Sequence, residues 1–281
     1  MLAIIGGTGL YQFESLSDVD EITLETPFGK PSSTVRLGSI EGKKVAFLPR
    51  HGNNHQFLPS EINYRANIFA LKTLGVTDII SVSATGSLQI EIAPGDLAIP
   101  SQFLDWTRGQ RNSSFFGNGM VAHVSTAQPV CAKLAQLVQK SAIQTEIKLH
   151  TGKTYACVEG PRLGTRAESF FLKNSGCDLV GMTNVPEVFL AREAQIGYCT
   201  IAVATDYDCW LDDPSQHASV EIVIRRYMEK IGTVKQLLVQ IIKNYELTDD
   251  RPSRQALKGA LMTPLDSLTL ENRNTIATLQ R

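Results

Sequence analysis

The chain has 281 residues, 43% of them apolar, with a formal net charge of −1 and a pI near 6.5. That length and composition supply a sizeable core, in one large domain or two small ones. No block of like charge appears and the apolar runs are far shorter than a membrane span, so we expect neither a nucleic-acid nor a membrane partner.

The N-terminal stretch MLAIIGGTGLY lacks the basic region of a secretory signal and becomes glycine-rich at once. The five cysteines have no C-x-x-C spacing. An odd, unclustered set of cysteines in a chain without a signal predicts reduced thiols and a cytoplasmic protein.

Short β-branched and apolar runs predict strands, and apolar residues at three- and four-residue spacing predict helices. In chain order we expect strands at 2–9 and 45–52, a helix at 61–75, a strand at 79–87, a helix at 129–142, strands at 155–162 and 179–187, a helix at 185–197, a strand at 200–208 and a long helix at 219–245. This alternation predicts an α/β fold: a single layered domain with a central mixed, mostly parallel sheet flanked by helices.

We assign residues 1–245 to this domain and residues 246–281 to a linker and a helical C-terminal tail. The stretch ELTDDRPSRQ at 246–255 has the composition of a linker. Two short helical pieces are expected after it, near 254–262 and 266–279.

Polar or glycine-rich clusters follow each predicted strand. In open α/β sheets, ligands bind beyond the carboxyl ends of the strands. We therefore expect these clusters to converge on one pocket.

The cluster GGTG at 6–9 invites a dinucleotide-binding interpretation. Aligned on Gly7 and Gly9, however, the G-x-G-x-x-G pattern meets Gln12 at its last glycine, and no acid follows about 20 residues on. A loop that holds phosphate through backbone amides and the Thr8 hydroxyl is favoured. A tight turn alone is the alternative.

Arg50 and His51 lie side by side at a predicted strand end. The planar guanidinium of arginine matches two phosphate oxygens, although a solvated surface loop would show the same pattern. His55 lies four residues beyond His51, but no third ligand is placed, so we predict no metal site.

Two acids, Asp206 and Asp208, follow a strand that is expected to be buried. We do not expect both to flank one glycosidic bond as a glycosidase pair would. Glu159 and Glu187 are expected to be structural, holding loop amides or Arg162 and Arg166, because buried carboxylates are usually paired.

A series of motifs, from residue 3 to about 245, closely resembles the 5′-methylthioadenosine phosphorylases of the trimeric purine nucleoside phosphorylase family. The motifs are IIGGTGL, TPFGKPS, RHG, NYRAN, PGD, VEGPR, RAES, MTNVPE and ATDYDCW, in the family's order. The resemblance implies phosphorolysis of 5′-methylthioadenosine to adenine and 5-methylthioribose-1-phosphate. It implies no metal or organic cofactor, with inorganic phosphate as co-substrate, and a homotrimer.

The resemblance also implies roles for individual residues. Phosphate would be held by Gly6, Thr8, Arg50, His51, Ser83, Ala84 and Thr183. Asp206 would bind N7 and N6 of adenine with Asp208 beside it, and these two are the catalytic candidates. The remaining substrate contacts would be Met182 at the ribose, Leu163 at the base, and His55, His123, Val220 and Val223 around the methylthio group, with His55 and Val220 belonging partly to neighbouring subunits.

Three positions depart from the adenosine-type pattern. Leu163 stands where an aromatic residue usually stacks on the base, Gly164 replaces a serine, and Thr85 stands where the human-type enzyme has cysteine. Three functions stay open at this point: the methylthioadenosine enzyme, a methylthioinosine or 6-oxopurine phosphorylase of the same fold, and a nucleoside-binding scaffold without activity.

Overall fold

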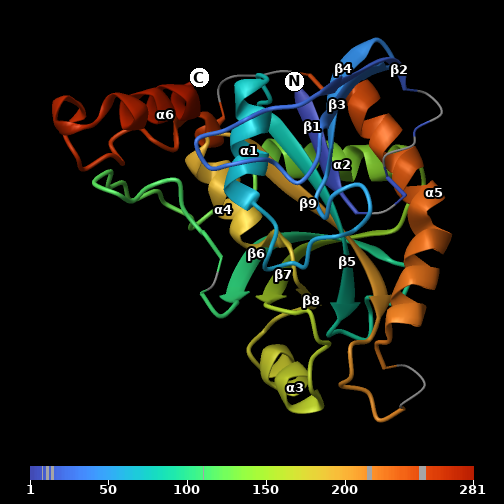
Figure 1. Ribbon diagram of the computed structural model, residues 1–281. Coiled ribbons are helices and arrows are strands. Elements are labelled where there is room, and N and C mark those ends of the chain that lie inside the picture. The colour runs from blue at the N-terminus through green and yellow to red at the C-terminus, as the bar shows by residue number, and fades with distance from the viewer. Residues whose placement is uncertain (8, 11–12, 14–15, 110, 214–216, 247–250) are drawn as a thin grey trace.

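A computed structural model of the chain describes all residues except 8, 11–12, 14–15, 110, 214–216 and 247–250. Within the described residues nine strands form one sheet, in the order β2-β3-β4-β1-β5-β8-β7-β6-β9 (Figure 1). Their bounds are β1 Leu2–Gly6, β2 Ser17–Ile22, β3 Val35–Ile40, β4 Lys43–Pro49, β5 Asp78–Ser87, β6 Leu97–Trp106, β7 Leu149–Val158, β8 Leu179–Gly181 and β9 Gly197–Asp206.

The sheet is mixed, as expected. Strand β1 pairs parallel with β4 and β5, whereas β3 runs antiparallel to β2 and β4. Strand β9 pairs with both β5 and β6, so that β5, β8, β7, β6 and β9 close into a five-stranded ring. The register of β5 on β9 sets Gly86 opposite Asp206.

Helices cover both faces of this sheet. Their bounds are α1 Tyr64–Thr73, α2 Ala132–Gln144, α3 Arg166–Asn174, α4 Asn184–Glu193, α5 Val220–Asn244 and α6 Leu270–Gln280. Apolar residues of α1, α4 and α6 contribute to one hydrophobic cluster, and those of α2 and α5 to another. In Figure 1, α1, α4 and α6 lie on one side of the molecule and α5 on the opposite side.

The structure adds elements that the periodicity did not reveal. Strand β2 is exposed along almost its whole length and carries no apolar alternation. Strand β6 has a proline, Pro100, and an exposed second half. The predicted strand at 179–187 was too long, because β8 ends at Gly181 and α4 begins at Asn184.

Helix α3, also missed, begins at a capping box. The Thr165 hydroxyl accepts from the Glu168 backbone N–H at 3.2 Å, and the Glu168 carboxylate accepts from the Thr165 N–H at 2.8 Å.

The C-terminal residues pack against the domain. Leu279 of α6 is fully buried in the cluster that contains α1 and α4. Arg251 pairs with the buried Asp78 at the start of β5, and the Tyr245 hydroxyl donates to the same carboxylate at 2.5 Å. The two expected helical pieces appear as a short 3-10 helix, Pro252–Gln255, and as α6 preceded by a second one, Leu265–Ser267. The division into domain and tail stays a prediction. Across the described residues, every helix is too short or too polar to cross a bilayer.

Candidate active site

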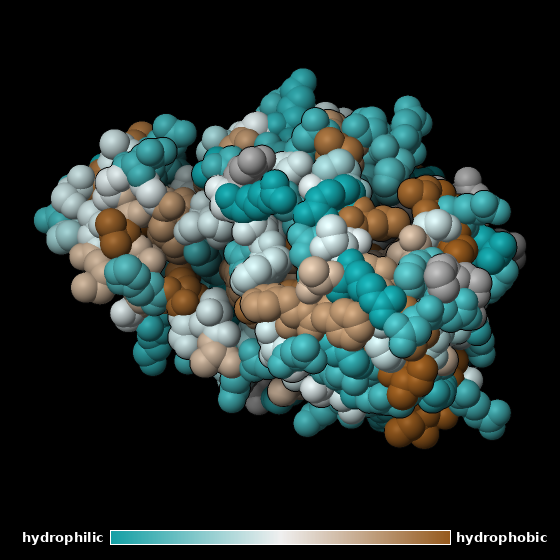
Figure 2. Space-filling view, turned by 90° about the horizontal axis from the view of Figure 1, so that it is seen from below, coloured by the Kyte–Doolittle hydropathy of each residue, from teal (hydrophilic) through white to brown (hydrophobic). Residues whose placement is uncertain are grey.

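A cavity of about 1140 Å³ opens at the carboxyl ends of the strands. Figure 2 looks onto this end of the molecule, where apolar side chains lie in patches among hydrophilic ones. Most of the residues singled out from the sequence line this cavity: Arg50, His51, His55, Ser83, Ala84, Leu163, Met182, Thr183, Asp206, Asp208, Val220 and Val223. The structure therefore brings together segments that lie far apart in the sequence.

Two expected residues do not line the cavity, and a third is not described. Gly7 lines the cavity, whereas Gly6 lies behind it and accepts a hydrogen bond from the Arg50 backbone N–H at 3.0 Å. Thr8 lies outside the described residues. His123 is exposed, and its backbone N–H donates to the Ala260 carbonyl at 2.9 Å, beside the tail instead of the cavity.

Asp206 and Asp208 lie next to each other at the cavity wall. Asp206 is the last residue of β9 and is 2% exposed, and Asp208 is 7% exposed. The Asp208 backbone N–H donates to Asp206 Oδ1 at 2.8 Å, and the Thr205 hydroxyl donates to Asp206 Oδ2 at 2.7 Å. The expectation that the two acids would not face one site was wrong, because both line the same cavity. Residues two apart on an extended chain face the same side, and Asp208 lies beyond the end of β9 with a left-handed φ of 51°.

Both acids have pKa values above the usual range for a carboxyl group. Burial, together with the smaller effect of the Asp208 charge, raises the pKa of Asp206 to about 6, against the opposing effects of its two hydrogen bonds and the nearby Arg226. Burial also raises the pKa of Asp208. A carboxyl group with a pKa near the working pH both donates and accepts a proton readily.

Gly86 makes room for this acid pair. A Cβ at Gly86 would lie 3.0 Å from Asp206 Oδ1 and 3.2 Å from the Cβ of Asp208. These contacts are tighter than most Cβ contacts in proteins, so a side chain here would press on both acids. The absence of a side chain at Gly86 thus allows the carboxylates to pack against β5.

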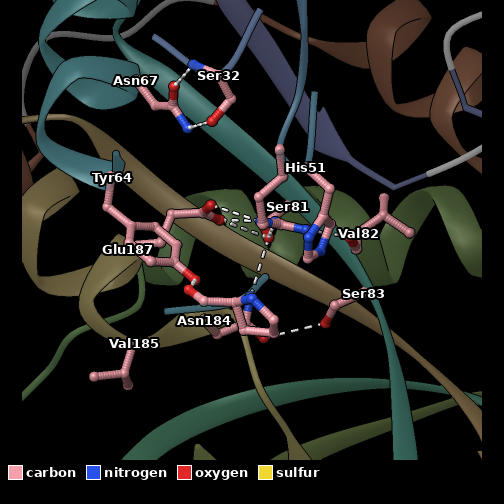
Figure 3. Close-up of polar contacts among 12 residues, drawn as sticks. Ser32, His51, Tyr64, Asn67, Ser81, Val82, Ser83, Asn184, Val185 and Glu187 are labelled. Carbon is pink, nitrogen blue, oxygen red and sulfur yellow. Dashed lines mark hydrogen bonds and ion pairs between the residues drawn. The ribbon is translucent and has the colours of Figure 1, made fainter. Parts of the chain in front are cut away.

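Arg50 is fixed from several sides. Its Nε and Nη2 donate to Glu187 Oε2 and Oε1 at 2.7 and 2.8 Å, Nη2 also donates to the Ser81 hydroxyl at 2.6 Å, and Nη1 donates to the Val82 carbonyl at 3.1 Å. Figure 3 shows Glu187 and Ser81 close together with Asn184 below them, and Ser81 is hydrogen-bonded to both. Arg50 therefore presents a charged, oriented guanidinium edge to the cavity that it lines.

The half-buried Glu159 and the buried Glu187 are both paired, but not with the expected arginines. Glu187 pairs with Arg50, and Glu159 pairs with Arg111 at 2.8 Å. Arg162 pairs with Glu168, which lies six residues away on α3, and Arg166 pairs with Asp212.

His51 lies beside Arg50 with its ring uncharged. Its Nδ1 lies 2.9 Å from the Phe57 carbonyl, so Nδ1 carries the hydrogen. Burial, with smaller contributions from Arg50 and His55, lowers the pKa of His51 to about 4. The rings of His51 and His55 stack at 4.3 Å. No cluster of three metal-binding side chains is found within the described part of the chain.

Helix α5 forms an apolar wall of the cavity through Val220, Val223, Ile224 and Met228. Val220 is 66% exposed, so this wall has an open edge. His55 and Val220 line the cavity of their own chain. Their partial contribution to neighbouring subunits stays a prediction.

Sequence reasoning missed two groups of residues that shape the site. Ser81, Asn184 and Tyr198 hydrogen-bond with one another and with Glu187, and the signal for them is a polar residue inside or beside an apolar run. Arg111 is buried and donates to the Met182 and Val185 carbonyls, both at 2.7 Å, on either side of Thr183. Its local sequence is that of an ordinary polar loop and gives no signal.

Comparison with known proteins supports the same family. The family model described as the phosphorylase superfamily matches residues 1–243. The S-methyl-5′-thioadenosine phosphorylase of Geobacter sulfurreducens is 44% identical over 97% of this chain and 95% of that protein, and that of Thermofilum pendens is 48% identical over 93% and 98%.

Solved structures agree. A methylthioadenosine phosphorylase from an antarctic soil metagenomic library superposes with a TM-score of 0.92 at 44% identity, covering 99% of this chain and 98% of that chain. Methylthioadenosine phosphorylase from Schistosoma mansoni in complex with adenine gives 0.88 at 34% identity, covering 93% and 98%. By its sequence, its fold and the residues gathered at its strand ends, this chain belongs to the phosphorylase superfamily.

Proposed function

We propose that this protein catalyses the phosphorolysis of 5′-methylthioadenosine to adenine and 5-methylthioribose-1-phosphate. The observation that carries the proposal is the buried pair Asp206 and Asp208, which shares one cavity with Arg50. Relatives with this printed activity match nearly the whole chain. The proposal needs no metal and no organic cofactor, with inorganic phosphate as second substrate.

In the proposed reaction the bond between C1′ and N9 breaks and its electron pair passes into the purine. A phosphate oxygen forms the new bond to C1′. Asp206 donates its proton to N7 of the leaving base, which relieves the developing negative charge. Arg50 and the hydroxyls of Ser83 and Thr183 hold the phosphate in line with C1′. This positioning lowers the entropic part of the activation barrier.

The acid pair also accounts for a preference for 6-aminopurines. An ionised carboxylate accepts a hydrogen bond from the 6-amino group and repels a 6-oxo oxygen. Sites built around such a match discriminate on the order of 10⁴-fold. Leu163, which lines the cavity and is 38% exposed, offers less stacking area than an aromatic residue. Weaker stacking loosens the selectivity for the base, and methylthioinosine stays the second candidate substrate.

We further propose a cytoplasmic homotrimer. His123 is one of the candidate residues that do not line the cavity of their own chain, and it is exposed beside the tail. A subunit interface at this surface would bring His123 to the methylthio pocket of a neighbour. The molar mass in solution, measured by light scattering, tests the trimer: a monomer of 30.8 kDa would contradict it.

The deciding experiment is purine release with and without phosphate, on methylthioadenosine, methylthioinosine, adenosine and inosine. We expect phosphate-dependent release of adenine, fastest from methylthioadenosine. Release of hypoxanthine from methylthioinosine at a higher kcat/KM would establish the second candidate. Nucleoside binding without release would leave only the scaffold.

A further inference from the structure

The Thr205 hydroxyl lies between two acceptors at the end of β9. Its Oγ1 is 2.7 Å from Asp206 Oδ2 and 3.3 Å from the Thr85 carbonyl oxygen on β5. The side chain is 1% exposed, so water does not substitute for either partner. A hydroxyl has one hydrogen and two lone pairs, so it donates to one of the two acceptors at a time and also accepts.

This arrangement satisfies Asp206 in both protonation states. When Asp206 is ionised, Thr205 donates to Oδ2 while the Asp208 N–H donates to Oδ1. When Oδ2 carries a proton, that O–H donates to Thr205 Oγ1, which turns its own hydrogen to the Thr85 carbonyl. The change needs rotation of one hydroxyl, and it avoids the cost of an unsatisfied buried polar group.

We propose that Thr205 is a positioning residue that lets Asp206 give up and regain its proton during each turnover. The inference rests on the proposed function, in which Asp206 protonates the purine. The O–H bond of Asp206 breaks and the N–H bond at N7 forms. The Thr205 hydroxyl then turns from the Thr85 carbonyl to the new carboxylate and stabilises it.

The other groups around Asp206 do not duplicate this role. Asp208 disfavours the ionised form through its like charge, and Arg226 of α5 favours that form from a position where its Nη1 donates to the Thr205 carbonyl at 2.9 Å. Beyond Asp208 lie Glu168 of α3 and His217. Strand β5 presents the uncharged Gly86. Among the side chains, the Thr205 hydroxyl makes the largest contribution that opposes the effect of burial on the pKa of Asp206.

The test compares Thr205→Val, which keeps the shape and removes the hydroxyl, with Thr205→Ser, which keeps the hydroxyl. The readout is the pH profile of kcat/KM for methylthioadenosine at saturating phosphate. In the wild type, kcat/KM should fall as the pH rises and Asp206 loses its proton; we call this fall the Asp206 limb. In Thr205→Val we expect the Asp206 limb to move about one pH unit higher and kcat to fall about tenfold, the scale of one hydrogen bond to a charged group. Thr205→Ser should keep the wild-type limb.

Thr85→Val is the matched control, because it removes a neighbouring buried hydroxyl and leaves the Thr85 carbonyl in place. The Asp206 limb of the Thr85→Val profile should stay at the wild-type pH, even if the variant's kcat changes. Should Thr205→Val fail to fold, Thr205→Cys replaces it, since a thiol is a weaker donor of similar size. A Thr205→Val profile that superposes on the wild type, or a Thr205→Ser limb that moves equally far, would overturn the proposal.

A second readout separates this inference from the proposed function. The infrared band of the protonated Asp206 carboxyl, assigned by its loss in Asp206→Asn, reports the titration without turnover. If the wild type releases no purine, the proposed function fails. The effect of Thr205 on Asp206 is then still measured by this band, which should persist to higher pH in Thr205→Val. An unchanged band refutes the inference alone.

Discussion

The guanidinium of Arg50 and the carboxylate of Glu187 form a two-pronged hydrogen-bonded pair, and each side chain is 1% exposed. Burial alone would lower the pKa of Arg50, but the charge and hydrogen bonds of Glu187 outweigh burial and raise it. Arg50, which lines the cavity, is therefore held in its charged form and in one orientation.

Arg50→Ala is expected to lower the free energy of unfolding by about 3–5 kcal/mol, because it leaves a buried carboxylate without its cation. The double variant Arg50→Met with Glu187→Leu should regain most of that loss, since it removes both charges. Urea unfolding of the three proteins measures this. A double variant no more stable than Arg50→Ala would contradict it. In the folded double variant the KM for phosphate should stay far above that of the wild type.

Asp206→Asn is expected to reduce kcat/KM for methylthioadenosine by about 10²- to 10⁴-fold, the usual range for losing a general acid. An amide has no acidic proton for N7, and it donates to a 6-oxo oxygen, so relative activity on inosine should rise. Steady-state kinetics on both nucleosides check this. Asp208→Asn is the matched comparison and should reduce kcat/KM for methylthioadenosine by a smaller factor. Wild-type turnover by Asp206→Asn would remove this acid from the mechanism.

The wild type is expected to prefer methylthioadenosine to adenosine by tens- to hundreds-fold in kcat/KM, since apolar contact alone discriminates by about 1–3 kcal/mol. Val223 lines the cavity from α5, and Val223→Thr places a hydroxyl in that wall. This change should narrow the preference several-fold while the KM for phosphate stays constant. Equal kcat/KM for the two nucleosides in the wild type would refute the methylthio assignment.

The carboxyl group of Glu193 should make the stability of the folded protein depend on pH. Burial raises the pKa of this carboxyl from 4.5 to about 7, although it accepts hydrogen bonds from the Ser114 hydroxyl at 2.8 Å and the Phe115 N–H at 2.7 Å. The folded state therefore holds the proton more tightly than the unfolded state, and its contribution to stability is present below pH 4.5 and lost as the pH rises through about 7.

Glu193→Gln should remove this dependence. The amide oxygen still accepts from the Phe115 N–H, and the amide nitrogen donates to the Ser114 hydroxyl. We expect the variant to melt higher than the wild type at pH 8 and close to it at pH 5. A constant difference in Tm between the two pH values would contradict the titration of Glu193.

The sequence predicts the part of the fold that depends on local pattern. Strand β1 is a continuous apolar run, β9 is nearly one, and α5 shows its apolar stripe plainly, so these elements could be placed. Strand β2 is exposed and polar, and exists because β3 pairs with it. Such tertiary pairing leaves no periodic trace in the chain.

The site shows the same division. Polar residues at strand ends could be located because the carboxyl ends of parallel strands meet at one edge. The hydrogen-bond partners of these residues could not be located from the sequence. Glu187 is 137 positions from Arg50, and Arg111 is 71 positions from Met182. The direction of the Asp208 side chain could not be predicted from strand alternation, because β9 ends at Asp206 and Asp208 adopts a left-handed φ.

The closed ring of β5, β8, β7, β6 and β9 has a consequence for how the chain folds. The second edge of β5 is covered only when β9 pairs with it, and β9 begins about 110 residues after β5 ends. Contacts between such distant segments slow folding, because a long loop closes before they form. A nascent chain that stops before Gly197 leaves the edges of β5 and β6 open to pairing with other chains. Chaperone binding during synthesis should therefore end only after β9 has left the ribosome.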